Sequence, residues 1–238
     1  MPRPLRITAP NLPFHIVDRG NNKQAIFKES KDFFYFLQLL ERYKKELEFN
    51  LYHLCLMPNH IHLMIEPTTE GSLSKAMMRL TLAYSSYFNQ KNKGVGHVWQ
   101  GRYKSSLIGG EDYFITCALY TELNPVRAKM VSHPQDYQWS SYNLYAFGQA
   151  HKLIENIIDF DPYYLKLGES DSARQKQYRE NISKVMKQDI LKNIRTQLYQ
   201  GVYGQEDFVR EMKKKFKIGS LRKVGRPRKR KMEAEEIN

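Results

Sequence analysis

The sequence predicts an α+β domain in which an antiparallel sheet carries its helices on one side. Two observations lead to this fold class. Short apolar stretches bounded by turn residues are typical of strands, and longer segments between them have apolar residues at helical spacing. The 238 residues are 41% hydrophobic and 13% aromatic, which is enough for a sizeable core. A chain of this length forms one large domain, or one domain with a smaller appendage.

The first half of the chain alternates between strand and helix patterns. Leu12–Val17 predicts a first strand, and the apolar spacing that follows predicts a helix over residues 30–48. Asn50–Leu56 and His60–Glu66 predict two more strands. The Pro58-Asn59 pair between them predicts a tight turn, so these two strands are expected to form a hairpin.

A second helix, a fourth strand and a third helix follow. Residues 72–92 predict the helix, and Ser105–Ile108 predicts the strand. The third helix is expected to end at Leu123 or Asn124, because Pro125 disfavours helical geometry in the residue before it. The order strand, helix, strand, strand, helix, strand, helix is that of a ferredoxin-like or RRM-like fold, the split βαβ arrangement.

The pattern changes near residue 147, where we place a domain boundary. Residues 134–142 are rich in turn formers and aromatics and are expected to pack back on the domain. Residues 172–199 predict a long polar helix, and residues 206–216 predict a shorter amphipathic one. The predicted organisation is a domain over residues 1–147, a helical extension over residues 148–218 and a flexible basic tail over residues 219–238.

The net charge of +13 is concentrated at the C-terminal end of the chain. The last 29 residues hold 12 Lys or Arg and four acidic residues, so they carry +8 of the net charge. Such a run contacts polyanions, and nucleic acid is the leading partner. A membrane surface is disfavoured as a partner, because the basic run has no interleaved apolar face.

Composition also indicates the compartment. No stretch approaches the length of a membrane-spanning helix, and the first residues lack the apolar region of a secretion signal. The sequence has only Cys55 and Cys117, both in apolar segments, so it predicts neither a disulfide framework nor a cysteine-based zinc site. The expected location is therefore the reducing cytoplasm.

The third predicted strand holds a compact motif, His60-Ile61-His62. The side-chain period of a strand is two, so the histidines share one face and Ile61 lies on the other. Two imidazoles placed in this way can hold one metal ion. Two ordinary strand histidines are the alternative, because a chance His-x-His is common.

The third predicted helix supplies candidates for the rest of a site. Tyr120 and Asn124 are four residues apart and therefore share a helix face. The side-chain oxygen of Asn124 can complete a ligand set with the histidines, and such a set suits Mg²⁺ or Mn²⁺ when phosphate is present. Tyr120 would then lie beside a metal-bound phosphate as a nucleophile. The alternative is an ordinary core tyrosine.

Residues 93–105 mix glycines, cations and aromatics with little periodicity. Arg102 and Lys104 can pair with phosphates. Trp99 and Tyr103 can stack on unpaired bases. The alternative is a flexible loop that is pinned by one tryptophan.

Several of these segments together resemble the HUH single-tyrosine transposases, and in particular their REP-associated members. The motifs occur in the family's order over residues 1–145, and the resemblance does not reach the C-terminal third with comparable strength. The matching motifs are Arg19–Asn22, Met57–Leu63, Val98–Ser105, Tyr120–Ala128 and Trp139–Tyr142.

The resemblance implies a chemistry for these residues. It implies that His60 and His62 bind a divalent metal, Mg²⁺ or Mn²⁺, and it puts Asn124 at the position of a third ligand, where many wider relatives have Gln, Glu, Asp or His. Tyr120 is the implied nucleophile, which attacks single-stranded DNA to give a 5′-phosphotyrosine and a free 3′-hydroxyl. The implied substrate is a hairpin formed by palindromic repeats, and residues 1–147 are the implied catalytic domain. Arg127, inside the motif around Tyr120, is a candidate DNA contact.

The basic tail contains Gly225-Arg226-Pro227-Arg228-Lys229, which resembles the core of an AT-hook. An extended Arg-Pro-Arg segment is narrow enough for the minor groove of A·T-rich DNA, so Arg226 and Arg228 are candidate DNA contacts. A tail that binds phosphates without preference is the alternative.

Two other functions are compatible with the sequence. One is a catalytically inactive or domesticated nucleic-acid-binding protein, such as a repressor or an RNA binder. The other is a metal-dependent nuclease that uses water in place of Tyr120. The sequence also leaves open a homodimer in which Tyr120 meets the histidine pair of a second copy. For the DNA-processing enzyme, the expected location is the cytoplasm in association with the nucleoid.

Overall fold

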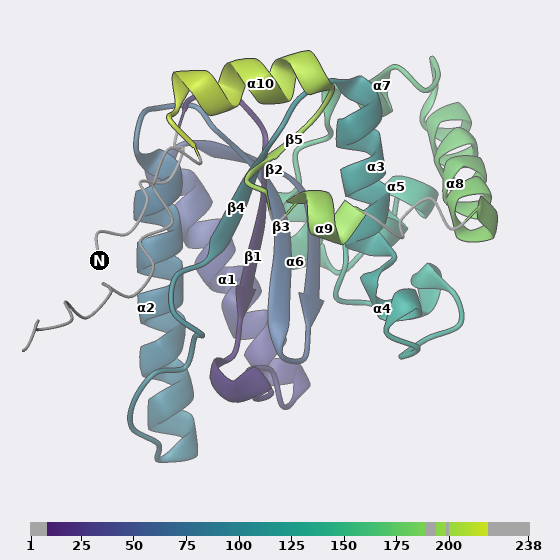
Figure 1. Cartoon of the computed structure of the whole chain (residues 1–238). Coiled ribbons are helices and arrows are strands. Elements are labelled where there is room, and N and C mark those ends of the chain that lie inside the picture. The colour runs from purple at the N-terminus through teal and green to yellow at the C-terminus, as the bar shows by residue number, and fades with distance from the viewer. Residues whose placement is uncertain (1–8, 189–193, 199, 219–238) are drawn as a thin grey trace, which may run out of the picture.

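The computed structural model, which describes residues 9–188, 194–198 and 200–218, has one sheet at its centre (Figure 1). In this part of the chain the strand order is β2-β3-β1-β4-β5. The strands are β1 (Phe14–Arg19), β2 (Phe49–Met57), β3 (His60–Pro67), β4 (Lys104–Ile108) and β5 (Val202–Tyr203).

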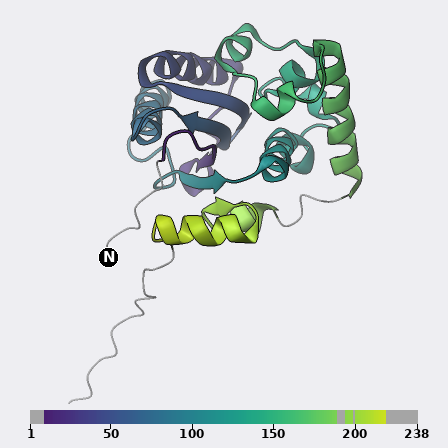
Figure 2. The same cartoon turned by 90° about the horizontal axis from the view of Figure 1, so that it is seen from above.

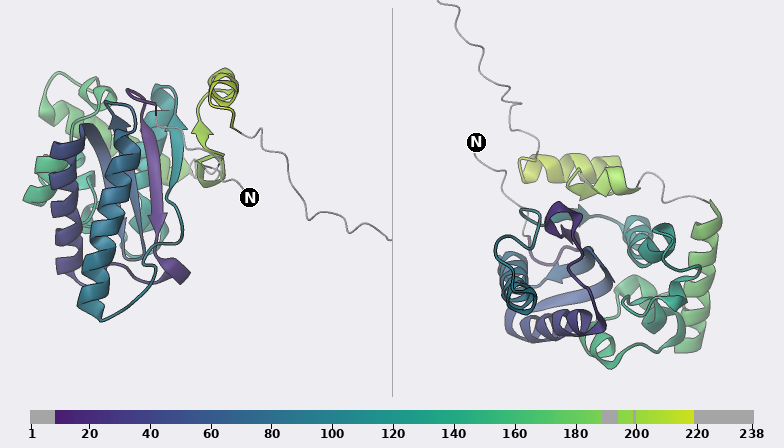
Figure 3. Two further views of the ribbon diagram at one scale, coloured as in Figure 1. Left: turned by 90° about the vertical axis from the view of Figure 1, so that its left-hand side faces the viewer. Right: turned by 90° about the horizontal axis from the view of Figure 1, so that it is seen from below.

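Helices lie on both faces of the sheet. α1 and α2 pack side by side on one face, and α9 and α10 lie beyond the other, as seen from above and from the side (Figures 2 and 3). None of the described helices is both long and apolar enough to cross a bilayer. The helices are η1 (Asn21–Lys23), α1 (Ser30–Leu47), α2 (Ser72–Asn92), α3 (Glu111–Glu122), α4 (Asn124–Arg127), η2 (Pro134–Asp136), α5 (Tyr142–Phe147), α6 (Lys152–Ile157), α7 (Pro162–Leu165), α8 (Asp171–Gln188), α9 (Ile194–Leu198) and α10 (Glu206–Lys215).

The two faces of the sheet differ because side chains alternate along each strand. Ile61 and Leu63 of β3 are fully buried beneath the α1–α2 layer. His60 and His62 alternate with them and face the side of α3, where His62 lies opposite Val17 of β1. The antiparallel register therefore places β1 side chains directly beside the histidine pair.

The predicted α+β class and the order of the first seven elements are confirmed, as is the hairpin of β2 and β3. The sheet departs from a purely antiparallel one at its edge, where β5 joins parallel to β4. A strand as short as Val202–Tyr203 shows no period in a sequence, and the open edge of β4 offers the backbone groups with which it pairs. Helix α3 also lies on the face opposite α1 and α2, so the helices are not confined to one side.

The segment after η2 packs back on the domain, as predicted for residues 134–142, and it does so at the free edge of β2. The Leu56 N–H donates to the Trp139 carbonyl at 2.9 Å, and the Ser141 N–H donates to the Leu54 carbonyl at 3.0 Å. The Trp139 ring stacks on Phe33 of α1 with a centroid distance of 4.4 Å. This segment therefore covers the outer edge of the sheet.

A buried ionic cluster links β2, α3 and the chain before α7. Nδ1 of His53 lies 2.9 Å from Glu122 Oε1, and its Nε2 lies 3.1 Å from Asp161 Oδ2. All three side chains are almost completely buried. An ionised carboxylate only accepts hydrogen bonds, so both ring nitrogens carry protons and His53 is an imidazolium ion. Its charge is tolerated in the interior because it is paired on both sides.

The stability of the fold is expected to fall as the pH rises above neutrality. Burial alone lowers the pKa of His53, but hydrogen bonds to Asp161 and Glu122 outweigh this and raise the pKa to about 9. Because the unfolded pKa is near 6.5, the cluster stabilises the fold fully below about pH 6.5 and loses this contribution as the pH rises through about 9. We expect a loss of roughly 3 kcal/mol in the free energy of unfolding across this window, measured by urea titration.

His53→Gln is the control for this pH dependence. It removes the titrating imidazole, so the fall in stability across this window should become much smaller, whatever the variant's absolute stability. The remaining slope comes from Cys55 and Cys117, because burial raises the pKa of both thiols. Tyr145 stacks on the His53 ring at 4.3 Å, but burial raises its pKa well above the usual value, so it does not titrate here. Equal slopes in the wild type and in His53→Gln would contradict the assignment.

Candidate active site

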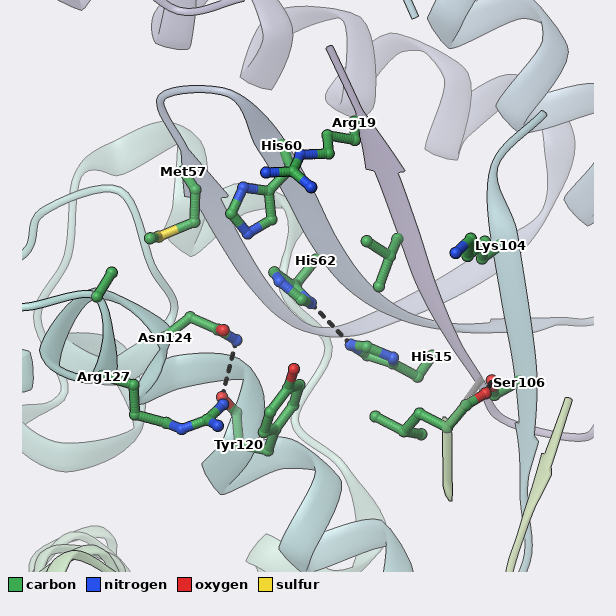
Figure 4. A pocket seen from close by; sticks show the side chains of 13 residues that line it. His15, Arg19, Met57, His60, His62, Lys104, Ser106, Tyr120, Asn124 and Arg127 are labelled. Carbon is green, nitrogen blue, oxygen red and sulfur yellow. Dashed lines mark hydrogen bonds between the residues drawn. The ribbon is translucent and has the colours of Figure 1, made fainter. Parts of the chain in front are cut away.

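The α3 side of the sheet holds a cavity of about 260 Å³ in which the residues predicted as nucleophile and metal ligands meet (Figure 4). β3 contributes His60 and His62, α3 contributes Tyr120, and Asn124 lies at the start of α4. β1 and β4 line the cavity as well, and Leu198 of α9 adds to its wall. All of these residues come from the one chain that the structure describes.

His60 is oriented by its neighbour Asn59. The Asn59 amide donates to the Lys23 carbonyl at 3.2 Å, which turns the amide oxygen toward His60. That oxygen lies 2.5 Å from His60 Nδ1 and accepts the proton there. In the neutral ring, the unprotonated Nε2 is therefore the atom with which His60 can bind a metal.

His15 of β1 is a site residue that the sequence analysis did not identify. It is buried, and its Nε2 lies 3.0 Å from His62 Nδ1 with the two rings stacked. Burial lowers the pKa of His15 to about 3, so its ring is neutral and can accept the Nδ1 proton of His62. In that tautomer His62 presents an unprotonated Nε2, which is how outer hydrogen-bond partners orient metal-binding histidines. The available sequence signal was the strand period, which puts His15 on the face of Val17 and Arg19.

Tyr120 points from α3 toward the histidines (Figure 4). Its ring is edge-on to those of His62 and His15, with centroid distances of 5.8 and 5.9 Å. The guanidinium carbon of Arg127 lies 4.8 Å from the centroid of the Tyr120 ring, a cation–π distance. The tyrosine is 4% exposed, so these neighbours fix the place of its ring.

Asn124 is tied to the end of the helix that carries Tyr120. α3 ends at Glu122, and Asn124 begins the short helix α4, so the helix ends slightly earlier than expected. Asn124 Nδ2 donates to the carbonyls of Tyr120 at 2.9 Å and Thr121 at 3.1 Å. Carbonyl oxygens only accept, so the amide orientation is fixed and Oδ1 is directed away from these two groups. Asn124 and Tyr120 line the same cavity, as their spacing predicted.

The donor atoms in the cavity fit a divalent metal. Within residues 9–188, 194–198 and 200–218, no three His, Cys, Asp or Glu side chains form a metal-binding group. A metal here would therefore be held by His60, His62 and the amide oxygen of Asn124, with water or substrate oxygens at the other positions. Nitrogen and oxygen donors in this combination suit Mn²⁺, and Mg²⁺ where phosphate adds oxygens.

Cations surround the mouth of the cavity. Arg19, Lys104 and Arg127 line it, and the latter two are exposed. Arg102 is exposed as well, in the loop that precedes β4. The predicted DNA contacts at Arg102, Lys104 and Arg127 are thus at the surface, where phosphates can reach them.

Trp99 and Tyr103, which were predicted to stack on bases, are both only 7% exposed. The Trp99 indole N–H donates to the Thr81 carbonyl at 3.1 Å, and its ring lies 5.9 Å from that of Tyr84. This burial leaves little of either ring open to a base. The structure therefore supports the alternative of a loop pinned by one tryptophan. Arg226 and Arg228 lie outside the described residues.

Trp99→Ala is expected to destabilise the fold rather than to impair DNA contacts alone. Removing a buried indole leaves a cavity and breaks the hydrogen bond to Thr81, so the free energy of unfolding should fall by about 3–5 kcal/mol. Urea unfolding measures this loss.

Arg102→Ala is the matched change in the same loop. It removes an exposed cation, so it should leave stability within about 0.5 kcal/mol of the wild type. It should also reduce the salt dependence of DNA binding by about one unit of slope. Unchanged stability in Trp99→Ala together with weakened DNA binding would contradict the assignment of Trp99 to the core.

Comparison with known proteins relates this geometry to a family. The family model described as "Transposase IS200 like" matches residues 8–124. This range includes His60, His62, Tyr120 and Asn124. No protein of curated function matches the chain.

Comparison with solved structures supports the fold through one match. A REP-associated tyrosine transposase bound to a REP hairpin is 16% identical, with a TM-score of 0.52 over 68% of this chain and 93% of that chain. At this identity the likeness establishes the fold alone. A putative transposase from Deinococcus radiodurans has 15% identity and a TM-score of 0.35 over 56% of this chain and 96% of its own. The tRNA(His) guanylyltransferase of Saccharomyces cerevisiae has 8% identity and a TM-score of 0.35 over 74% of this chain and 80% of its own. Both of these TM-scores are too low to establish a shared fold.

Proposed function

The chain belongs, through residues 8–124, to the family of IS200-like transposases, and on this premise we propose that it cleaves and rejoins single-stranded DNA with Tyr120 as its nucleophile. The proposed substrates are hairpins formed by palindromic repeats. The proposed intermediate is a 5′-phosphotyrosine. A protein with such a substrate would work in the cytoplasm, where it would bind the DNA of the nucleoid.

The position of Tyr120 is the observation that carries this proposal. Its ring lies edge-on to His62 at 5.8 Å, in a cavity that also holds His60 and Asn124. A tyrosine that served only the core would not need two histidine side chains and an amide oxygen around it. The exposed cations Lys104 and Arg127 at the same cavity suit a phosphodiester substrate.

In the proposed reaction, Tyr120 Oη attacks the phosphorus and the bond from phosphorus to the 3′ oxygen breaks. The phenol loses its proton, and the leaving 3′ oxygen takes one up. The covalent intermediate keeps the bond energy, so the reverse attack by a 3′-hydroxyl rejoins strands without a nucleotide cofactor.

The other residues of the cavity would bind and orient the scissile phosphate. Arg127, held over the Tyr120 ring, and Lys104 would neutralise its charge. His60, His62 and Asn124 would hold a divalent metal, which when bound polarises and orients the phosphate. Asn124 also links this ligand set to the helix of the nucleophile, through its hydrogen bond to the Tyr120 carbonyl.

A covalent adduct tests the proposal. The full-length protein is incubated with Mn²⁺ and single-stranded hairpins from the DNA that flanks its own gene, labelled at the 3′ end. We expect a labelled band at the mass of the protein plus the downstream fragment on a denaturing gel. Cleavage without such a band would contradict the tyrosine mechanism, and no cleavage of any flanking hairpin would contradict the substrate class.

A further inference from the structure

The helix that carries Tyr120 is held from its other side by a buried carboxylate, Glu122. Two residues along an α-helix turn the side chain by about 200°, so Glu122 points away from the cavity into which Tyr120 points. Glu122 is fully buried, and its neighbour Thr121 is as well. The placement of Tyr120 therefore depends on what binds Glu122.

Three elements bind Glu122. Its Oε1 accepts the Ser141 hydroxyl at 2.6 Å and the Nδ1 proton of His53 at 2.9 Å. Its Oε2 accepts the Tyr178 hydroxyl at 2.6 Å. The partners come from β2, from the turn before α5 and from α8, so this end of α3 is fixed from three directions.

Asp161 extends the same cluster into the C-terminal extension. Its Oδ2 accepts the Nε2 proton of His53, and its Oδ1 accepts the backbone N–H groups of Tyr163 and Tyr164 at 2.9 and 2.8 Å. It thereby caps the short helix α7. Asp161 and Tyr178 both lie beyond residue 147, and both lie beyond the segment matched by the family model.

The cluster resists rearrangement because it is buried. Two carboxylates and one imidazolium ion have partners on every side, and moving α3 would leave one of them unpaired in the interior. A misplacement of about 1 Å at a reacting atom costs roughly 100-fold in rate. A rigid attachment on the far side of α3 therefore has a direct consequence for a nucleophile on its near side.

We infer that His53, Glu122, Asp161 and Tyr178 form a positioning cluster, through which the C-terminal extension sets the position of Tyr120 for attack. This inference rests on the proposed role of Tyr120. The four residues touch no reacting atom, and they act through the backbone of α3. The extension is then part of the catalytic apparatus in addition to any contact that it makes with DNA.

Tyr178→Phe tests the inference, because it removes one hydroxyl from Glu122 and keeps the ring. Tyr164→Phe is the matched control. Tyr164 is equally buried, its ring lies 5.7 Å from that of Tyr178, and its hydroxyl donates to the Tyr145 carbonyl at 2.9 Å instead. For each variant, the dissociation constant of the hairpin and the single-turnover rate of adduct formation are measured separately.

We expect Tyr178→Phe to lower the rate about 10- to 100-fold with the hairpin dissociation constant within about twofold of the wild type. Tyr164→Phe should leave both quantities near wild type. Ser141→Ala removes the other hydroxyl from Glu122 and should show the same split, which keeps the test decisive if Tyr178→Phe does not fold.

Two outcomes would overturn the inference while the proposed function stands. One is a wild-type rate in Tyr178→Phe and Ser141→Ala. The other is a parallel loss of affinity and rate, which is the result of general destabilisation. The absence of an adduct with the wild type would instead overturn the proposed function, and this inference with it.

Discussion

Tyr120→Phe should abolish covalent attachment to DNA and leave hairpin binding intact. The change removes the attacking oxygen, while the ring keeps its contacts with His15, His62 and Arg127. The rate of adduct formation should fall by more than about 1000-fold, because the remaining groups have no nucleophile to direct. A denaturing gel measures the adduct, and fluorescence anisotropy with the labelled hairpin measures binding.

Tyr113→Phe is the matched control on the same helix. Tyr113 lies seven residues earlier, two turns away on the same face, and its ring packs against Tyr203 of β5 at 4.9 Å. Its hydroxyl should be dispensable for the adduct. An adduct that persists in Tyr120→Phe and is lost in Tyr113→Phe would reassign the nucleophile.

His62→Ala should remove both metal binding and catalysis. In the proposed metal site the ring supplies one of the two imidazole donors, and His60 and Asn124 alone would make a poor ligand set. We expect the Mn²⁺ affinity of the free protein, measured by calorimetry, to fall below detection. The rate of adduct formation should fall roughly 1000-fold, the equivalent of several kcal/mol of lost charge stabilisation. Chelation of the metal should reproduce this loss in the wild type.

Two further histidine variants show whether the loss of Mn²⁺ binding is specific to His62. His97→Ala removes an exposed histidine from the loop before β4, so it should leave Mn²⁺ affinity unchanged. His15→Ala keeps the ligands and removes the partner of His62 Nδ1, so it should weaken Mn²⁺ binding about 10- to 100-fold. Wild-type Mn²⁺ affinity in His62→Ala would contradict the proposed ligand set.

Local patterns were sufficient for much of the fold and for the core of the candidate site. The period of two put His60 and His62 on one face, and the four-residue spacing put Asn124 beside Tyr120. Both inferences depend on geometry within a single element, which the sequence encodes directly. The order of strands and helices follows from the same periodicities, and the structure agrees with it.

The features that the sequence did not reveal depend on contacts between distant segments. His15 joins the site only because β1 pairs with β3, and a lone histidine in an apolar strand carries no mark of that pairing. Glu122 finds its partners at His53, Ser141 and Tyr178, which are far from one another in the chain. The burial of Trp99 could not be predicted either, because composition does not distinguish an aromatic side chain that binds a base from one that anchors a loop.

Peptide mapping of the adduct tests the central claim most directly. Trypsin cleaves after Lys104 and after Arg127, and no Lys or Arg lies between them, so one peptide carries Tyr113 and Tyr120 as its only tyrosines. After nuclease trimming of the DNA, tandem mass spectrometry should locate a 5′-linked nucleotide on Tyr120 in this peptide. A nucleotide on any other residue, or cleaved DNA with this peptide unmodified throughout the reaction, would contradict the account.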